Sequence, residues 1–236
     1  MTSADDTVPA GPGVLWTATP TGRRGPKPRH SLEGIAEAAI AIADTEGLEV
    51  VTMQRVAESL GTTKMALYRY LPGRADLDAV MLDSALGAPP PPRGERWDDA
   101  LVAWTGALFA RALERPWSVE LAQRPHTPGP QELAWYETGL AATDGLPLTA
   151  GERLDLLALL SGHALSLVRQ EAGARAAEEE LAAGLAAVLA AHSDRFPRTS
   201  AAFADAGRAE QRDDAFRFGV RRVLAGIAAL VAEREA

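Results

Sequence analysis

Apolar residues recur every three or four positions along most of the chain, which is the spacing of one helix face, and no stretch alternates strictly enough to predict a β-strand. In residues 31–77 the pattern predicts three short helices, at 32–43, 53–60 and 63–70. Thr52 suits the N-cap of the second helix, Gly61 suits its end, and Pro72 stops the third. Helix, tight turn and helix form the plan of a helix-turn-helix motif, whose second helix enters the major groove of DNA.

This spacing alone is not specific, because two short amphipathic helices around a glycine also occur in helical proteins that bind no nucleic acid. The third helix favours DNA binding, since a helix that only packs does not need many hydrogen-bond donors. Its donors are Thr62, Thr63, Lys64, Tyr68, Arg69 and Tyr70. The rival interpretation is a helical small-molecule-binding or adaptor protein whose helix-turn-helix contacts another protein.

Three stretches of this segment carry a family resemblance. They are the helix from residue 35 that ends in Glu-Gly-Leu at 46–48, the run TMQRVAESLG at 52–61, and the run TTKMALYRYLPGRADL at 62–77. Their most specific mark is Leu-Tyr-Arg-Tyr followed by a basic residue and an Asp-Leu pair. The segment resembles the DNA-binding domain of the TetR family of transcriptional repressors, and the resemblance covers about the first third of the chain.

The resemblance implies an all-α fold with a three-helix helix-turn-helix domain at 31–77 and a C-terminal helical ligand-binding and dimerisation domain at 78–236. It implies a homodimeric DNA-binding regulator of transcription, a repressor that leaves a palindromic double-stranded operator when a small, largely apolar effector binds. Carried over by position, the side chains that reach base edges are Gln54, Lys64, Met65 and Tyr68. Those that hold phosphates are Thr52, Thr63, Arg69, Tyr70 and Arg74.

The N-terminal 30 residues predict an extension outside the helical domains. Residues 1–21 are rich in Pro, Gly, Thr and Ala without periodicity, which predicts disorder. Residues 22–30 form a basic arm, whose charged side chains are Arg23, Arg24, Lys27 and Arg29. The arm is either a solvated linker or an extended segment that binds phosphates and enters the minor groove. It is similar to an AT-hook, although Arg24-Gly25-Pro26 lacks the second arginine of that motif.

The rest of the chain predicts a helical body. A helix at 75–86 leads to Pro89–Pro92, which breaks the pattern. Further helices are expected at 97–115, 117–123, 131–143, 149–170, 175–192 and 213–233, with a capping box at Thr149–Glu152 and a break at Phe196-Pro197. The helices at 152–170 and 213–233 are predicted to pair with their copies in a dimer, because Gly162, Ala164, Gly219 and Gly226 permit close approach.

Aromatic residues cluster in one part of this body, since four of the five tryptophans lie within residues 97–135. Such a cluster is either ordinary core packing or the lining of a cavity for an apolar ligand. The candidate lining residues are the aromatic Trp104, Phe109, Trp117, Trp135 and Tyr136, with His126, His163 and Arg169 as polar contacts.

The charge distribution supports a DNA-binding head. Of the net charge of −8, residues 75–236 carry −8 and residues 1–21 carry −2, whereas residues 22–74 hold eight basic and six acidic side chains. A locally basic head can therefore meet phosphates while the acidic body faces away from them.

Several kinds of chemistry are not expected. The chain has no cysteine, its four histidines lack the spacing of metal ligands, and no nucleophile elbow or phosphate-binding loop occurs. The sequence thus predicts no metal, no cofactor, no catalytic residue and no enzyme activity. Because no secretory signal and no run of about 20 apolar residues occurs, we expect a cytoplasmic protein without a membrane span.

Overall fold

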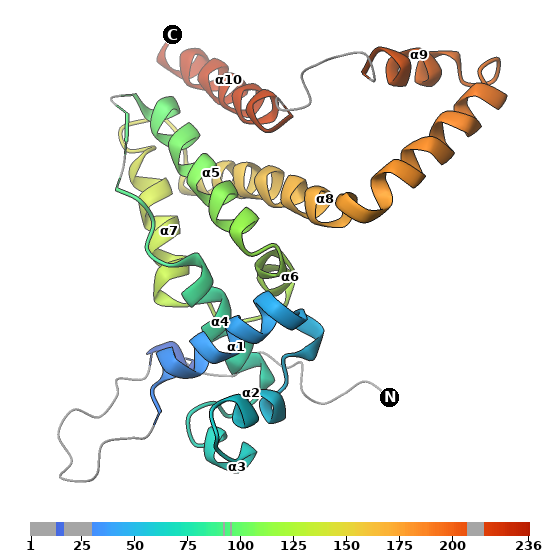
Figure 1. Ribbon diagram of the computed structural model, residues 1–236. Helices are drawn as coiled ribbons and strands as arrows, with labels where there is room; N and C mark the ends of the chain where they lie inside the picture. The colour runs from blue at the N-terminus through green and yellow to red at the C-terminus, as the bar shows by residue number, and fades with distance from the viewer. Residues whose placement is uncertain (1–12, 17–29, 92, 95, 207–214) are drawn as a thin grey trace.

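The computed structural model describes residues 13–16, 30–91, 93, 94, 96–206 and 215–236, with the backbone alone at 172–183 (Figure 1). Every regular element in these ranges is a helix, which confirms the predicted all-α fold. None of these helices is both long and apolar enough to cross a membrane.

Three short helices form a head at the lower end of Figure 1: α1 (Leu32–Glu46), α2 (Met53–Ser59) and α3 (Lys64–Leu67). The Ser31 hydroxyl caps α1 by accepting a hydrogen bond from the Gly34 amide at 3.1 Å. The last residue of α1 is Glu46, and the cap that follows is Gly47, whose φ of 98° favours glycine. The helix thus extends beyond residue 43, where the predicted helix ended. A single turn, η2 (Leu48–Val50), leads to α2.

α3 is shorter than the helix predicted over 63–70, because the chain tightens after Leu67. The Tyr70 amide donates to the Leu67 carbonyl at 2.8 Å, so this turn closes over three residues instead of four. Pro72 follows two positions later and cannot continue a helix.

α4 (Arg74–Leu86) joins the head to the body. Its residues Leu77 and Met81 are fully buried in the same core as Ile35 of α1, and this core extends to Leu121 of α6 (Trp117–Gln123). α4 continues without a break through residues 77 and 78, where the sequence analysis places the domain boundary. The helix is shared by the two parts, because Leu77 and Met81 lie in the head core and Leu86 packs against the body core.

The body packs four longer helices around a second core: α5 (Trp97–Glu114), α7 (Pro130–Ala141), α8 (Ala150–Ala191) and α10 (Ala215–Glu235). The buried residues of this core are Leu101, Trp104, Leu108, Trp135, Leu156, Leu157, Leu160, Val220 and Leu224. α5 packs against α8, and α10 packs against both of them.

α8 differs from the prediction of separate helices at 149–170 and 175–192, since it is one helix of 42 residues. The predicted capping box is confirmed, because Thr149 and Glu152 bond to each other's backbone amides at the start of the helix. Between the two predicted helices the sequence is rich in Ala and Glu and has no proline, so the single Gly173 does not end the helix.

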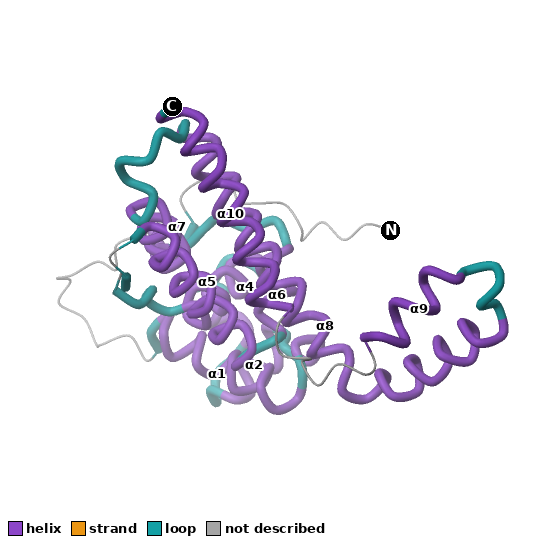
Figure 2. Tube along the Cα trace, turned by 90° about the horizontal axis from the view of Figure 1, so that it is seen from above, coloured by secondary structure: helices purple, strands orange, loops and turns teal. Residues whose placement is uncertain are grey.

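α9 (Pro197–Ala206) was not predicted, because the sequence indicates only a break at Phe196-Pro197. Proline is also favoured at the first position of a helix, where its missing amide hydrogen is not needed, and here it begins one. The C-terminal part of α8 and α9 project together from the body (Figures 1 and 2).

The N-terminal extension is folded at the few positions that are described within it. Val14–Trp16 form a 3₁₀ turn, η1, with Val14 and Leu15 packed against the head core. The Trp16 indole donates to the Pro128 carbonyl at 2.8 Å, 112 residues away in sequence. At these residues the expectation of disorder is wrong, because the apolar side chains of Val14 and Leu15 pack against the head core beside α4.

Candidate nucleic-acid interface and ligand cavity

The turn between α2 and α3 fixes the tip of the head. The Thr52 hydroxyl accepts from the Arg55 amide at 3.0 Å and starts α2, and the Thr63 hydroxyl accepts from the Ala66 amide at 3.2 Å and starts α3. Val56 of α2 and Leu67 of α3 are fully buried between the helices. The opposite face of α3 must therefore point outward.

The outward surface of α3 and the two residues after it carries Lys64, Met65, Tyr68 and Arg69. The apolar side chain of Met65 is 75% exposed, and the Lys64 ammonium lies 5.5 Å from the centre of the Tyr68 ring. Within the described part of the chain, neither Lys64 nor Arg69 forms an ion pair with an acidic side chain. Two cations, an exposed thioether and an exposed phenol ring give this surface groups suited to phosphates and base edges.

The other described residues that were predicted to contact DNA are hydrogen-bonded within the head or partly buried. Thr52 and Thr63 use their hydroxyl oxygens as caps, and Gln54 donates to Glu58 at 2.8 Å along its own helix. Tyr70 is half-buried against the head core. The arm residues Arg23, Arg24, Lys27 and Arg29 lie outside the described residues.

Arg74 faces the protein instead of solvent. Its guanidinium donates to Asp78 at 2.6 Å and to the Val51 carbonyl, just before the N-cap of α2. These contacts occupy the side chain inside the junction of head and body, so the structure does not favour the predicted phosphate contact. The reason is tertiary, since the partner carbonyl is 23 residues away in sequence.

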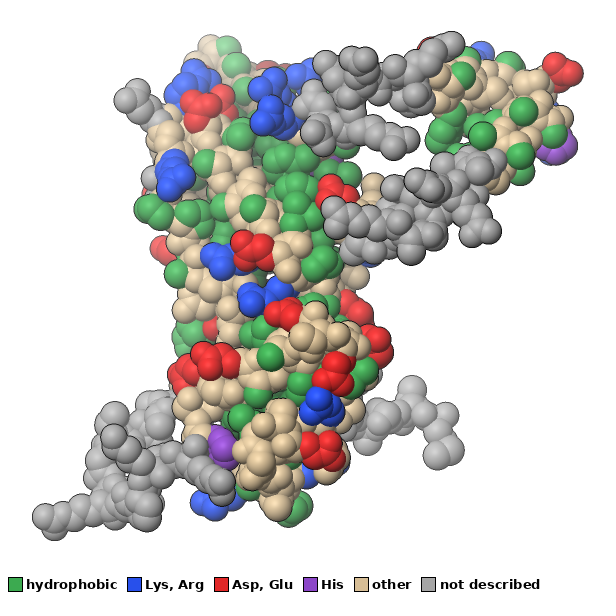
Figure 3. Space-filling view, viewed as in Figure 1, with side chains coloured by type: hydrophobic (Ala, Val, Ile, Leu, Met, Phe, Trp, Pro, Cys, Tyr) green, Lys and Arg blue, Asp and Glu red, His purple; other side chains and the backbone are tan. Residues whose placement is uncertain are grey.

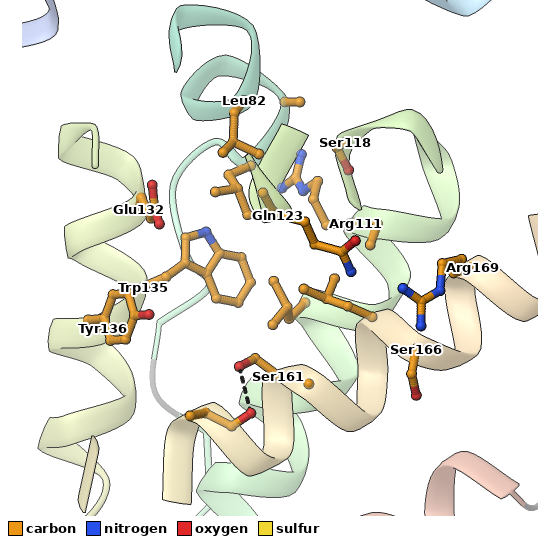
Figure 4. Close-up of a pocket in the computed structure, with 18 of the residues that line it drawn as sticks. Leu82, Arg111, Ser118, Gln123, Glu132, Trp135, Tyr136, Ser161, Ser166 and Arg169 are labelled. Carbon is orange, nitrogen blue, oxygen red and sulfur yellow. Dashed lines mark hydrogen bonds between the residues drawn. The ribbon is translucent and has the colours of Figure 1, made fainter. Parts of the chain in front are cut away.

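A cavity of about 380 Å³ opens in the body between five helices (Figure 4). Its lining comes from α4 (Leu82, Ala85, Leu86), α5 (Trp104, Leu108, Arg111, Ala112), α6 (Ser118, Ala122, Gln123), α7 (Glu132, Trp135, Tyr136) and α8 (Ala158, Ser161, Gly162, Leu165, Ser166, Arg169). Its size and its largely apolar wall suit a small organic ligand.

Two tryptophans give the cavity a fixed wall. Trp104 and Trp135 meet edge to face, with ring centres 6.0 Å apart and an angle of 65° between their planes. The Trp104 indole donates to the Trp135 carbonyl at 3.0 Å, and the Trp135 indole donates to the Gly87 carbonyl at 2.9 Å. Because both indole N–H groups are committed, the rings can offer a ligand only apolar surface.

The structure brings half of the predicted ligand residues into this cavity: Trp104, Trp135, Tyr136 and Arg169. The other four lie elsewhere. Phe109 stacks on Phe216 of α10 with ring centres 4.6 Å apart, and His163 lies 3.2 Å from the Phe216 carbonyl. Trp117 donates from its indole to Asp44 of α1 at 2.7 Å. Both sets of contacts hold helices together, so these side chains are not part of the cavity wall.

His126 lies behind the wall, where it holds Glu132. Its Nε2 is 3.0 Å from Glu132 and its Nδ1 is 2.7 Å from the Arg124 carbonyl. The hydrogen bond to Glu132 raises the pKa of His126 above its usual value, against the opposing effect of burial. The cavity wall is thereby connected to the loop after α6.

Polar contacts continue from that loop to the head. The Arg124 guanidinium donates to Asp78 of α4 at 2.7 Å, and Asp78 also accepts from Arg74, which holds the Val51 carbonyl. Glu132 at the cavity and Val51 at the base of α2 are thus linked by a chain of polar contacts, which includes the Arg124 backbone carbonyl.

Sequence reasoning missed all of the lining except Trp104, Trp135, Tyr136 and Arg169, including the whole contribution of α4 and α6. Leu108, Arg111 and Ala112 follow Trp104 at spacings of four, seven and eight residues, which is one face of a helix. That periodicity was a usable signal once Trp104 was a candidate. No comparable signal marks Ser118 or Gln123, because α6 reaches the cavity only through its packing on α4 and α8.

Within the described ranges no group of three or more His, Asp or Glu side chains could hold a metal ion.

Comparisons with known proteins agree with this architecture. Residues 35–78 match the family model of bacterial regulatory proteins of the tetR family, and residues 88–231 match that of the tetracyclin repressor-like C-terminal domain. The chain is 32% identical over 235 residues to the HTH-type transcriptional repressor DrrR1 of Streptomyces coeruleorubidus, covering 94% of this chain and 86% of that protein. An HTH-type transcriptional regulator of Saccharopolyspora erythraea is 27% identical, with 96% of each chain covered.

Solved structures share the fold at lower identity. Apo ActR of Streptomyces coelicolor superposes with a TM-score of 0.76 at 21% identity, over 87% of this chain and 98% of that one. ActR in complex with actinorhodin gives a TM-score of 0.74 at 22% identity over the same shares. BioQ with its double-stranded DNA operator gives 0.59 at 17% identity, over 85% of this chain and 99% of that one.

Proposed function

Because the chain belongs to the TetR family of bacterial regulatory proteins, and is a DNA-binding transcriptional regulator, we propose how its parts carry out that role. A homodimer binds a palindromic operator through the two copies of α3 and represses transcription. A small molecule that fills the cavity between α4 and α8 releases it. Regulation of this kind places the protein with the chromosome, in the cytoplasm.

The exposed face of α3 is the observation that carries this proposal. Lys64 and Arg69 have no acidic partner among the described residues, and the apolar side chain of Met65 is 75% exposed. Lys64 can donate to guanine, Met65 can contact a thymine methyl group, and Arg69 can bind a phosphate. An adaptor surface for another protein would not need two unpaired cations at the tip of one helix turn.

Two heads are needed because one short α3 reads only a few base pairs. In a two-fold dimer they must lie about 34–36 Å apart, or a multiple of that distance, to enter successive major grooves. The described surface of α8 and α10 offers a face for this dimer, since Leu159 is 57% exposed and Phe218 is 64% exposed. Hydrophobic side chains gather on the upper part of the body in Figure 3.

The small residues predicted for the dimer face do not all lie on it. Gly226 has open space where a side chain would stand, which suits close approach of a second copy. Gly162 lines the cavity, and Ala164 is fully buried within one subunit. A side chain at Gly219 would collide with His163, so Gly219 serves the packing of α10 on α8. Of the four, we therefore assign only Gly226 to the dimer face.

Coupling between cavity and operator rests on α4. Leu82, Ala85 and Leu86 near its C-terminus line the cavity, while Arg74 at its N-terminus holds the Val51 carbonyl beside α2. A ligand that displaces α4 changes the position of the head, and in a dimer it changes the distance between the two recognition helices. That the ActR structure contains actinorhodin supports a ligand role for the matching domain of this chain.

Operator binding is tested by fluorescence anisotropy with the double-stranded DNA that lies upstream of the protein's own gene. We expect tight binding to this duplex, and log Kd should change with log salt by about 0.9 for each phosphate neutralised. The double variant Lys64→Ala with Arg69→Ala should lose binding. Arg96→Ala, which removes an exposed cation of the body, should not. Equal binding by all three proteins would contradict the proposed surface.

A further inference from the structure

The cavity contains hydrogen-bond donors that the protein itself leaves unused. Arg111 of α5 lines it half-buried, and no acidic side chain in the described ranges pairs with it. Ser118 of α6 is only 9% exposed, and its hydroxyl has no hydrogen-bond partner among the described residues. Both groups line the cavity, so water or a ligand there can supply their acceptor.

Three other polar groups of the wall are already committed. Ser161 donates to the Leu157 carbonyl at 2.7 Å and Ser166 to the His163 carbonyl at 2.8 Å. Glu132, the acidic group of the lining, is held by His126 at 3.0 Å. The charged lining groups that have no partner among the described residues are therefore the cations Arg111 and Arg169, beside the neutral Gln123 amide and the Tyr136 hydroxyl.

The opposite side of the cavity is aromatic. Figure 4 shows Trp135, Tyr136 and Glu132 on the α7 side, away from Arg169 and Ser166 on α8. The Trp135 ring is buried, and its N–H is bonded to Gly87, so its free surface is an apolar face. Flat aromatic groups pack well against such a ring, with centre distances of about 4.5–7 Å.

From this division we propose that the cavity takes a planar aromatic ligand that carries an anionic group. The ring system packs against Trp135 and Trp104, and the anionic group binds the Arg111 guanidinium with help from the Ser118 hydroxyl. The proposal rests on the cavity being the effector site, and it adds the chemical class of the effector. A guanidinium can bind a carboxylate through two parallel hydrogen bonds, which gives orientation as well as affinity.

Arg169 has a separate part in this scheme because it is exposed at the rim. A cation at the entrance raises the local concentration of anions in an otherwise acidic protein, and this effect fades with salt. The buried contact with Arg111 is screened much less. Salt should therefore weaken the contribution of Arg169 more than that of Arg111.

The proposal is tested with two probes that have the same shape and differ in charge, anthracene-2-carboxylate and anthracene-2-carboxamide. Binding is followed by quenching of tryptophan fluorescence, since Trp104 and Trp135 line the cavity. The wild-type protein should bind the carboxylate about 10-fold to 100-fold more tightly than the carboxamide, which is the range of a charge-assisted hydrogen bond. Arg111→Met should remove this preference, because the carboxylate loses its charge-assisted hydrogen bonds.

Arg96→Met is the matched control, because Arg96 is an exposed arginine near the start of the same helix α5 and pairs with Asp98 away from the cavity. It should keep the full preference for the carboxylate. Measurable carboxamide binding by Arg111→Met, together with an unchanged circular dichroism spectrum, shows that this variant still folds around its cavity. Equal wild-type affinity for the two probes, tighter binding of the cationic 2-(aminomethyl)anthracene, or no binding of the carboxylate would overturn the proposal.

These outcomes are separate from those of the operator experiment, which contains no ligand. A protein that binds its upstream DNA but shows no preference for the carboxylate would retain the proposed function and lose the proposed ligand class. A protein that binds the carboxylate through Arg111 but no DNA would show the reverse.

Discussion

The Arg124 guanidinium donates to the Asp78 carboxylate at 2.7 Å and so joins the loop after α6 to the first turns of α4. The Asp78 side chain is only 10% exposed, and its other oxygen accepts from Arg74 at 2.6 Å. One carboxylate therefore holds two arginines, one from the body and one that reaches the Val51 carbonyl in the head.

Asp78→Asn should weaken both the fold and the response to ligand. The substitution leaves two partly buried arginines without their anion, and we expect a loss of about 1–3 kcal/mol in the free energy of unfolding. Urea denaturation measures this loss, and Asp155→Asn on the exposed surface of α8 is the control, with little change. A folded Asp78→Asn protein whose DNA is released by ligand as in the wild type would exclude this ion pair from the coupling.

Lys64→Ala should change which DNA sequence is preferred, whereas Arg69→Ala should weaken binding to all sequences alike. The reason is that Lys64 lies at the start of α3, where it can reach a base edge, and Arg69 lies beyond its end, suited to a phosphate. We expect Lys64→Ala to cost about 1–3 kcal/mol on the preferred site. Selection from a pool of randomised duplexes measures the preference, and an unchanged consensus for Lys64→Ala would show that the base contact is wrongly assigned.

His126 should make stability fall as the pH rises above neutrality. Its hydrogen bond to Glu132 raises its pKa in the folded protein, so protonated His126 favours the folded state. This contribution is fully present below the unfolded pKa, about 6.5, and is lost as the pH rises through the higher folded value. Thermal unfolding of wild type and His126→Gln between about pH 6 and pH 9 measures it, and the difference between the two proteins should shrink toward high pH. A constant difference would show that His126 acts through packing alone.

Leu159→Glu should separate the dimer without unfolding the subunit. Leu159 is 57% exposed on α8, so a charge there harms an interface with a second copy and little else. Leu224→Glu is the contrasting variant, since Leu224 is 5% exposed in the core of one subunit and a charge there should unfold it. Sedimentation and circular dichroism together measure assembly and helicity. A Leu159→Glu protein that remains dimeric would move the interface away from this face of α8.

The sequence by itself determined the helices whose ends are marked locally. The Thr52 cap, the turn at Gly61 and the Thr149–Glu152 capping box were all predicted and confirmed, because a cap is a contact between residues three positions apart. The family was also readable from residues 35–77, since the segment that packs three helices and reads DNA keeps a recognisable pattern. The length of α8 was misread because a single glycine is a weak stop when its neighbours favour a helix.

Only the tertiary structure decided which side chains face the cavity. Trp104 and Phe109 lie five residues apart on α5, so they point to different faces of the helix, but their spacing does not tell which face meets the cavity and which meets α10. Arg74 illustrates the same point, since it donates to the carbonyl of Val51, a partner distant in sequence that local spacing does not indicate. Contacts between separate helices depend on packing angles and distances that local spacing does not contain.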